Sequence, residues 1–255
     1  MSQLLEGKTA LILGVANKWS LAYAIAHAFR REGAAVLLTY QGERLKSPVE
    51  ELGADLGVAR VFECDVTKDD HLSRLPDVVK EHGRLDAMIH SVAFANREDL
   101  SRPFVETSRA GYMLAQDVSA YSMVAVARAT APLMTAGGSM TTLTYLGSTR
   151  VVPNYNVMGV AKAALEAAVR YLANDLGPAN IRVNAISAGP VKTASARAVK
   201  DLSTMLEKAP ARAPLRRNCE PAEVADAAVF LASDLGRGVT GNIIFVDAGL
   251  QLLGL

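Results

Sequence analysis

Two side chains that could move a proton and stabilise charge lie seven residues apart, at Tyr155 and Lys162. An α-helix turns by about 100° per residue, so this spacing returns both side chains to one face, two turns apart. A phenol can donate a proton, and an ammonium beside it can bind a sugar hydroxyl and favour the phenolate form. Ordinary amphipathic surface helices also carry such pairs, so the meaning of this pair depends on the elements around it.

A second tyrosine, Tyr145, ends an apolar run over residues 139–145 that has the pattern of a strand. The segment from Tyr145 to Lys162 therefore passes from a strand end through a loop into a helix. In α/β proteins, ligands bind outside the carboxyl ends of the strands. Tyr145 is thus a further candidate for an active site shared with Tyr155 and Lys162.

The composition indicates one large domain over residues 1–255. The chain is half hydrophobic with a formal charge of +1, which gives no support for binding nucleic acid or a membrane surface. It lacks an export signal and any apolar run of the roughly 18 residues that a membrane helix needs. Cys64 and Cys219 lie far apart without metal-ligand spacing, which predicts reduced thiols, no metal site and a cytoplasmic protein.

Strand and helix patterns alternate along the chain. Strands are expected at 9–14, 35–40, 60–64, 85–91, 139–145, 181–187 and 242–246. Helices are expected at 21–31, 69–81, 108–134 and 221–232, with another bearing Lys162 and one beginning at Ser47-Pro48. This alternation predicts an α/β fold with a single doubly wound parallel sheet, the Rossmann fold, with helices on both faces.

The predicted strand ends indicate a dinucleotide site. Gly14 follows the first strand, where a glycine lets the backbone approach a pyrophosphate, and Ser20 stands where a helix cap is expected. The match to G-x-G-x-x-G is poor, because only the first glycine is present. Asp65 could accept hydrogen bonds from adenine or could simply cap a turn. Further strand ends place Gln41, Val66, Ser91, Val92 and Ala93 at the same edge.

The end of the second strand bears on the choice of cofactor. A 2′-phosphate requires a nearby cation, whereas a free ribose accepts a neutral or acidic partner. Gln41 is neutral, Gly42 has no side chain, and Arg44 is expected to point away along a helix. These residues favour NADH over NADPH.

With these features in order, and with the segments NYNVMGVAKAALEA and RVNAISAGPV, the chain resembles the enoyl-[acyl-carrier-protein] reductases (NADH) of the FabI type. These belong to the short-chain dehydrogenase/reductase superfamily, and the resemblance covers essentially the whole chain. It implies a Rossmann domain, usually assembled as a homotetramer. It also implies the last reductive step of fatty acid elongation, in which NADH reduces the trans-2 double bond of an enoyl chain on acyl carrier protein.

Matching positions imply a role for each site residue. The catalytic residues are Tyr145, Tyr155 and Lys162, with Lys162 also binding the nicotinamide ribose, and substrate contacts are expected at Ala95, Tyr145 and Met158. Two residues depart from the family pattern. Trp19 fills a position in the phosphate loop that is expected to vary, and Ala93 replaces a frequent glycine. The cofactor is expected to contact Gly14, Ser20, Leu21, Gln41, Asp65, Val66, Ser91, Val92, Ala93, Lys162, Val191 and Thr193.

Residues about 191–219 are expected to form an insertion that covers the substrate. Within it, residues 193–212 combine small apolar side chains with Arg197, Lys200 and Lys208. These could act as a mobile lid over the acyl chain and meet an acidic carrier protein. A plain amphipathic surface helix is the alternative.

The position four residues before Lys162 separates this chain from ketone-reducing relatives, which have Tyr-x-x-x-Lys and a serine on the preceding strand. Here that position is Met158, and Thr142 is the hydroxyl nearest to the place of the serine. The phenol lies three residues earlier, about 4.5 Å along a helix axis, which suits an enolate oxygen two carbons from the hydride acceptor. A carbonyl reductase or alcohol dehydrogenase remains the alternative enzyme, and a dinucleotide-sensing regulator the alternative without catalysis.

Overall fold

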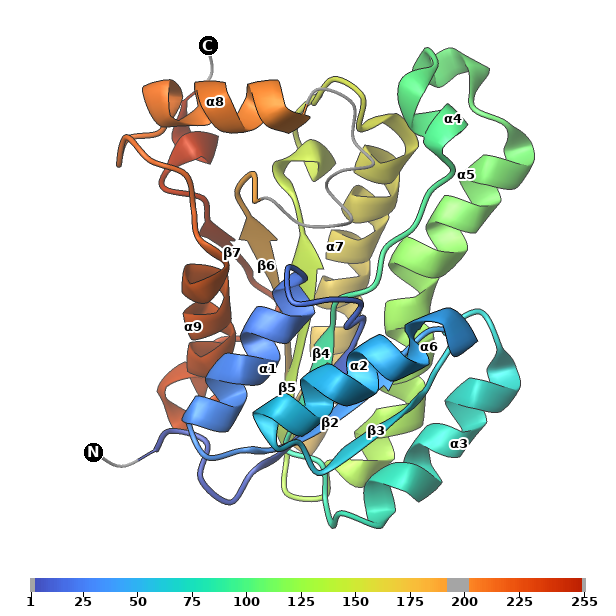
Figure 1. Ribbon diagram of the computed structural model, residues 1–255, viewed down its shortest axis with the longest axis vertical. Coiled ribbons are helices and arrows are strands. Elements are labelled where there is room, and N and C mark those ends of the chain that lie inside the picture. Colours follow the sequence, from blue (N-terminus) through green and yellow to red (C-terminus); the bar gives the residue numbers. More distant parts are fainter. Residues whose placement is uncertain (1–2, 192–201, 254–255) are drawn as a thin grey trace.

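A parallel seven-stranded sheet forms the centre of the computed structural model, which describes residues 3–191 and 202–253. The strand order is β3-β2-β1-β4-β5-β6-β7 (Figure 1). This arrangement confirms the predicted doubly wound α/β class. The strands are β1 (Thr9–Leu13), β2 (Ala35–Tyr40), β3 (Arg60–Glu63), β4 (Ala87–His90), β5 (Gly138–Thr144), β6 (Ile181–Ala188) and β7 (Ile243–Val246).

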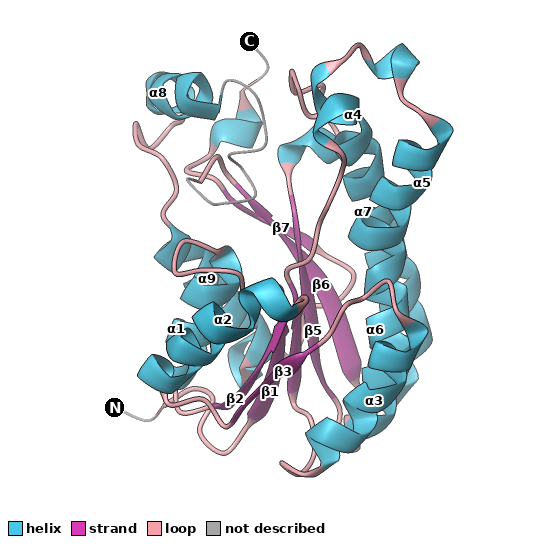
Figure 2. Ribbon diagram, turned by 45° about the vertical axis from the view of Figure 1, so that its right-hand side comes forward, coloured by secondary structure: helices cyan, strands magenta, loops and turns pink. Residues whose placement is uncertain are grey.

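Helices cover both faces of the sheet, as Figure 2 shows. One face carries α1 (Leu21–Arg31), α2 (Glu43–Leu56) and α9 (Pro221–Ala232). The other carries α3 (Asp69–Lys80), α5 (Arg109–Gln116), α6 (Ser122–Thr130) and α7 (Asn156–Leu176). Beyond the carboxyl ends of the strands lie α4 (Arg97–Ser101) and α8 (Leu202–Arg212). Short helices are η1 (Phe104–Glu106), η2 (Asp117–Tyr121), η3 (Ala131–Leu133), η4 (Leu146–Ser148), η5 (Gly177–Ala179), η7 (Asp234–Gly236) and η8 (Leu250–Leu252).

Strand β1 shows why the sequence forms a two-sided core. Leu11, Ile12 and Leu13 are all fully buried. Successive side chains of a strand point to opposite faces, and here Leu11 and Leu13 join the cluster under α3, α6 and α7 while Ile12 joins the cluster under α1 and α9. A continuous apolar run is the pattern expected of a parallel strand covered on both sides.

The predicted start of the second helix was wrong. Helix α2 begins at Glu43, directly after Gly42, so Pro48 lies inside the helix rather than at its first position. Gly42 has φ of 73°, a left-handed conformation that turns the chain out of β2 into the helix. Pro48 removes one helical hydrogen bond, but it is exposed, where water can satisfy the unpaired carbonyl.

The long helix predicted over residues 108–134 is interrupted. Between α5 and α6 lies the π-helical segment η2, and η3 follows α6. The hydroxyl of Ser119 in η2 accepts from the backbone N of Phe94 at 2.9 Å and lies 3.1 Å from its carbonyl oxygen. This tertiary contact fixes the helix to the loop after β4, and π-helical turns of this kind often occur near functional sites.

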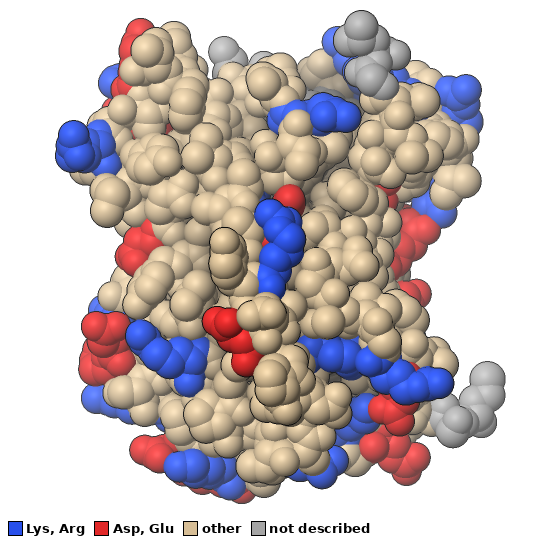
Figure 3. Space-filling model, turned by 180° about the vertical axis from the view of Figure 1, so that it is seen from behind, with Lys and Arg blue, Asp and Glu red and all other residues tan. Residues whose placement is uncertain are grey.

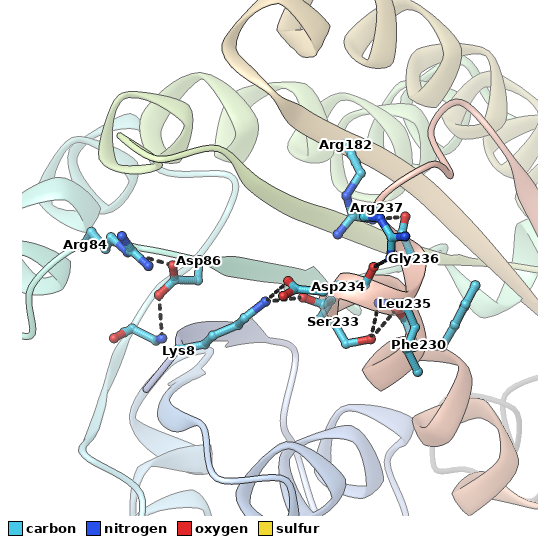
Figure 4. Close-up of polar contacts among 12 residues, drawn as sticks. Lys8, Arg84, Asp86, Arg182, Phe230, Ser233, Asp234, Leu235, Gly236 and Arg237 are labelled. Carbon is cyan, nitrogen blue, oxygen red and sulfur yellow. Dashed lines mark hydrogen bonds and ion pairs between the residues drawn. The ribbon is translucent and has the colours of Figure 1, made fainter. Parts of the chain in front are cut away.

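Polar contacts tie together the edge of the sheet where the strands begin (Figure 4). Lys8 binds Asp234 at 2.9 Å just after α9, and Arg84 binds Asp86 at 2.8 Å before β4. The other carboxylate oxygen of Asp86 accepts from the backbone N of Thr9 at 2.9 Å. These contacts join the starts of β1 and β4 to the end of α9, at the edge opposite the carboxyl ends of the strands.

The face turned away in Figure 1 is shown in Figure 3. Lys, Arg, Asp and Glu are interspersed on it, with large areas that carry no charge. Across the ranges that the structure describes, no helix combines the length and apolar character needed to cross a membrane.

Candidate active site

The predicted site residues meet at the carboxyl edge of the sheet. The strand order reverses between β1 and β4, and ligands of open α/β sheets bind at such a switch point. One of the predicted cofactor contacts, Thr193, lies outside the described residues. Along the edge, in sheet order, the strands are followed by Asp65 after β3, Gln41 after β2, Gly14 after β1, Ser91 after β4, Tyr145 after β5 and Val191 after β6.

Gly14 joins the ends of β1 and β4. Its φ is +94°, and a Cβ built on it would lie 2.1 Å from the carbonyl oxygen of Ser91. No side chain can occupy that position without moving the backbone of Ser91. The glycine is therefore required by an internal contact, besides the predicted approach of a pyrophosphate.

Ser20 is the N-cap of α1, as predicted. Its hydroxyl accepts from the backbone N of Tyr23 at 3.3 Å and donates to the carbonyl of Asn17 at 2.7 Å. The first turn of a helix leaves other N–H groups without helical partners, and these attract anions. Helix α1 begins at Leu21, so its N-terminus lies directly after the loop in which a pyrophosphate site was predicted.

Asp65 stabilises the turn after β3, which was one of its two predicted roles. Its Oδ1 accepts from the backbone N of Thr67 at 3.0 Å and from the Thr67 hydroxyl at 2.8 Å. Burial alone would raise the pKa of the Asp65 carboxyl, but these bonds and one from the Gln41 side chain lower it. Asp65 and Gln41 therefore lie together, while Arg44 is exposed on α2.

Tyr145 and Tyr155 form the aromatic part of the site. Tyr155 is the N-cap residue of α7 rather than a residue within the helix. The two rings are T-shaped, with centroids 5.0 Å apart and planes at 68°. Gly147 makes room for this contact, since a Cβ there would lie 2.4 Å from Cδ1 of Tyr155. Sequence reasoning missed Gly147, and also Gly159, where a Cβ would lie 2.7 Å from the Gly147 carbonyl oxygen.

Both phenols are held in the protonated form. Burial raises the pKa of Tyr155 well above its usual range, and the neighbouring Tyr145 and Glu166 raise it further. Burial and the charge of Asp247 raise the pKa of Tyr145 to about 12. Burial thus favours the protonated phenol of Tyr155, opposite to the effect expected of a neighbouring ammonium. A protonated phenol is nevertheless a suitable hydrogen-bond donor to a developing negative charge.

Lys162 is buried on α7, with 6% of its surface exposed. Its Nζ donates to the carbonyl of Leu143 at 2.7 Å. Burial lowers the pKa of the ammonium to about 8, an effect that the charge of Glu166 opposes. An ammonium has three N–H donors, so the bond to Leu143 leaves others for a ligand.

Thr142 has no free hydroxyl for catalysis. Its Oγ1 lies 2.9 Å from Nδ1 of His90 and 3.1 Å from the His90 carbonyl oxygen, and both residues are fully buried. The Nε2 of His90 lies 2.8 Å from Oγ of Ser122. This network was not foreseen from the sequence, and it engages the hydroxyl that the sequence had marked as nearest to the place of a catalytic serine.

Ala95 and Met158, which were predicted to contact the substrate without a catalytic role, belong to one small apolar cluster. Ala95 and Met158 are both buried, and Tyr155 packs against the cluster they share with Leu100 and Val157. Met158, four residues before Lys162, is thus a buried apolar residue packed beside Tyr155. The remaining predicted cofactor contacts range from buried Val66 and Val191 through half-buried Val92 to exposed Ala93.

The doubly wound sheet, with Tyr145, Tyr155 and Lys162 gathered at the end of β5, is typical of dinucleotide-dependent oxidoreductases of the short-chain class. More specifically, the chain belongs to the enoyl-[acyl-carrier-protein] reductase family, as predicted. A family model described as "Enoyl-(Acyl carrier protein) reductase" matches residues 14–251.

Relatives agree along the whole chain. A Bacillus cereus protein named "Enoyl-[acyl-carrier-protein] reductase [NADH] FabI" is 53% identical, covering 99% of this chain and all of the relative. A crystal structure of the Bacillus cereus enzyme with NADP+ and an indole naphthyridinone has a TM-score of 0.97, at 53% identity and with 99% of this chain and 100% of that chain covered. The Anaplasma phagocytophilum reductase with NAD has a TM-score of 0.96 at 45% identity, covering 100% of this chain and 98% of that one.

Proposed function

We propose that this protein uses NADH to reduce the trans-2 double bond of enoyl-acyl-carrier-protein thioesters, with Tyr155 as the hydrogen-bond donor. The observation that carries the proposal is the identity of two residues on the N-terminal side of Lys162, namely Tyr155 and Met158. The protonated phenol of Tyr155 lies seven residues earlier, whereas buried Met158, four residues earlier, has no proton to give. The predicted activity and cofactor are those in the names of the curated relatives.

The residues at the strand ends suit a dinucleotide. NADH, when bound, supplies the hydride. Lys162 binds the nicotinamide ribose through its remaining N–H donors, and the start of α1 holds the pyrophosphate. Gln41 is neutral and Arg44 is exposed on α2, which favours a free ribose. The other residues proposed to line the cofactor are Gly14, Ser20, Leu21, Asp65, Val66, Ser91, Val92, Ala93, Val191 and, outside the described residues, Thr193.

Tyr155 acts on the thioester carbonyl. When hydride reaches the β-carbon, negative charge develops on the carbonyl oxygen, and the phenol hydrogen bond stabilises it. Removing one such donor typically costs ~3–4 kcal/mol of activation free energy. Tyr145, Ala95 and Met158 form the wall that excludes water and orients the acyl chain.

The alternatives differ in substrate. With NADH, we expect the protein to reduce crotonyl thioesters and to leave acetoacetyl thioesters nearly unchanged, as followed by loss of NADH absorbance. Faster reduction of the acetoacetyl thioester would instead indicate a carbonyl reductase. NADH binding without turnover of either substrate would indicate a regulator. The bonding of Thr142 to His90 argues against the carbonyl reductase.

Helix α8 is proposed to meet the carrier protein. It lies within the predicted insertion, beyond the carboxyl edge, and Lys208 on it is exposed. Arg197 and Lys200, and the rest of the predicted lid up to residue 201, lie outside the described residues. Lys208→Glu should raise KM for carrier-protein substrates but not for coenzyme A thioesters, because only the former present an acidic protein surface. An equal effect on both would contradict this docking role.

A homotetramer is also proposed, supported by an apolar groove. The groove runs over α5, η2, α6 and α7, and Met113 and Tyr121 are 62% and 48% exposed there. Exposed apolar surface of this kind is typical of a subunit interface. Ala168→Glu, within the groove, should reduce the mass measured by light scattering. A wild-type protein that is monomeric would contradict the proposal. The groove residues are Met113, Gln116, Asp117, Ala120, Tyr121, Val124 and Ala168.

We also propose that the protein is cytoplasmic and that it folds as a single domain. A cytoplasmic location is supported by Cys64 and Cys219, which are both free and buried. A single-domain organisation is supported by the one sheet that all the described strands share. Cell fractionation tests the location, and export of the protein would contradict it. Limited proteolysis tests the single domain, and a protease-resistant fragment lacking part of the sheet would contradict it.

A further inference from the structure

A buried carboxylate lies beside the proposed catalytic face of α7. Glu166 is only 7% exposed and stands four positions after Lys162, one turn further along the same face. Glutamates are seldom buried to this extent without a partner, because removing a charge from water is costly. None of the steps proposed above uses Glu166.

Two consecutive residues of β5 hold the side chains of Lys162 and Glu166. The carbonyl of Leu143 accepts from Nζ of Lys162 at 2.7 Å, and the hydroxyl of Thr144 donates to Oε1 of Glu166 at 2.6 Å. Thr144 is itself 4% exposed. The strand therefore fixes an ammonium and a carboxylate at adjacent positions, one turn apart on the helix.

The charges of this buried pair are complementary. The negative charge of Glu166 favours the ammonium form of Lys162, against the effect of burial, which lowers its pKa to about 8. Burial, with a further effect from the charge of Lys162, lowers the pKa of His90 on β4 to about 3, so His90 is neutral at ordinary pH. Glu166 is thus the carboxylate whose charge offsets the burial of Lys162.

Other titratable groups near α7 are engaged elsewhere or exposed. Tyr145 and Tyr155 remain protonated at ordinary pH, and Asp247 after β7 accepts from the backbone N of Gly249 and Gln251. Asp99 of α4 accepts from Asn96 and Ser108, and Arg182 of β6 donates to Gly236. The remaining charged or phenolic groups on α4, α5, α6 and η2 are exposed, namely Arg97, Glu98, Arg109, Tyr112, Asp117, Tyr121 and Arg128.

We propose that Glu166, anchored by Thr144, is a positioning residue whose carboxylate keeps the buried Lys162 ammonium charged and ready to bind the cofactor ribose. The inference deepens the proposed function, since it rests on the role of Lys162 in binding NADH. Glu166 itself touches neither cofactor nor substrate in this scheme.

The test is the pH dependence of NADH affinity, titrated by fluorescence between pH 6 and pH 10. In the wild-type protein, affinity should fall as Lys162 loses its proton. In Glu166→Gln, which keeps the size and can still accept from Thr144, the midpoint of that fall should move about one pH unit lower. Glu166→Asp should bring the midpoint back toward the wild-type value, because the charge is restored. Asp175→Asn, on an exposed part of the same helix, serves as the control and should leave the midpoint unchanged.

A merely structural role would lower NADH affinity equally at every pH, and an unmoved midpoint in Glu166→Gln would overturn the proposal. If that variant does not fold, Thr144→Val decides, since loss of the anchor should move the midpoint in the same direction by a smaller amount. An NADH affinity of the wild-type protein that does not vary with pH would overturn this inference but not the proposed function. Failure of the proposed function would appear separately, as a lack of crotonyl thioester reduction by the wild-type protein.

Discussion

Lys162 donates a hydrogen bond from Nζ to the carbonyl oxygen of Leu143 at 2.7 Å, which ties the middle of the site helix to the end of β5. The bond aims the side chain at the carboxyl edge of the sheet, where the strand ends place the other proposed cofactor residues. It explains how a long, flexible side chain is kept in one orientation while buried.

Lys162→Met should lose NADH affinity at least tenfold, or about 1.4 kcal/mol. The methionine fills a similar volume but cannot donate to ribose hydroxyls. Fluorescence titration of NADH checks this, with exposed Lys80→Met on α3 as the control for loss of a positive charge. Unchanged affinity in Lys162→Met would rule out the proposed role.

Gly14→Ala should be far more damaging than Gly83→Ala, although both glycines have nearly the same φ, +94° and +91°. At Gly83 nothing lies within 4 Å of a new Cβ, so only left-handed strain is added, about 1–2 kcal/mol. At Gly14 the new Cβ would also meet the Ser91 carbonyl oxygen at 2.1 Å. Urea unfolding compares the free energies, and equal losses would contradict the close approach of β1 and β4.

His90 should make the protein sensitive to acid. Burial lowers its pKa to about 3, below the value near 6.5 of an unfolded chain. Between these values the unfolded state binds more protons, so stability falls as pH falls from 6.5 toward 3 and is unaffected above 6.5. The full effect is on the order of 5 kcal/mol.

His90→Gln should therefore flatten the fall in unfolding free energy between pH 6.5 and pH 4, even though it lowers stability at pH 7 by disturbing the bonds to Thr142 and Ser122. Exposed His27→Gln is the control. Parallel curves for His90→Gln and the wild-type protein would show that His90 does not carry this dependence.

Helix α1, strand β2 and helix α9 run over the predicted ranges, because their apolar periodicity and caps are local. The π-helical segment η2 could not be predicted in this way, since it depends on the contact between Ser119 and Phe94, 25 residues apart. The start of α2 was misplaced because Ser47-Pro48 has the form of a helix start, while the turn at Gly42 begins the helix earlier.

Spacing and strand ends were enough to propose Tyr145, Tyr155 and Lys162. They were not enough to find His90, whose importance appears only when the register of β4 and β5 places it beside Thr142. Glu166 did have a sequence signal, because it lies four residues after Lys162. Its burial against Thr144 was what made the signal meaningful.

The two tyrosines should differ in kinetics. Tyr155→Phe removes the proposed donor to the enolate oxygen and should lower kcat tenfold or more, about 1.4 kcal/mol per tenfold. Tyr145→Phe keeps the ring of the acyl-pocket wall and should act mainly on KM. NADH affinity should be nearly intact in both. Steady-state kinetics on one enoyl thioester compares them, and a larger loss of kcat in Tyr145→Phe would reverse the assignment.

The central claim is that the protein reduces a carbon–carbon double bond, with charge stabilised at the carbonyl oxygen. Its most direct test is the position of the label after crotonyl thioester is converted with NADH deuterated at the transferable hydrogen. We predict a butyryl thioester with deuterium on the β-carbon and a solvent proton on the α-carbon. Deuterium on the carbonyl carbon, with the double bond retained, would contradict the account.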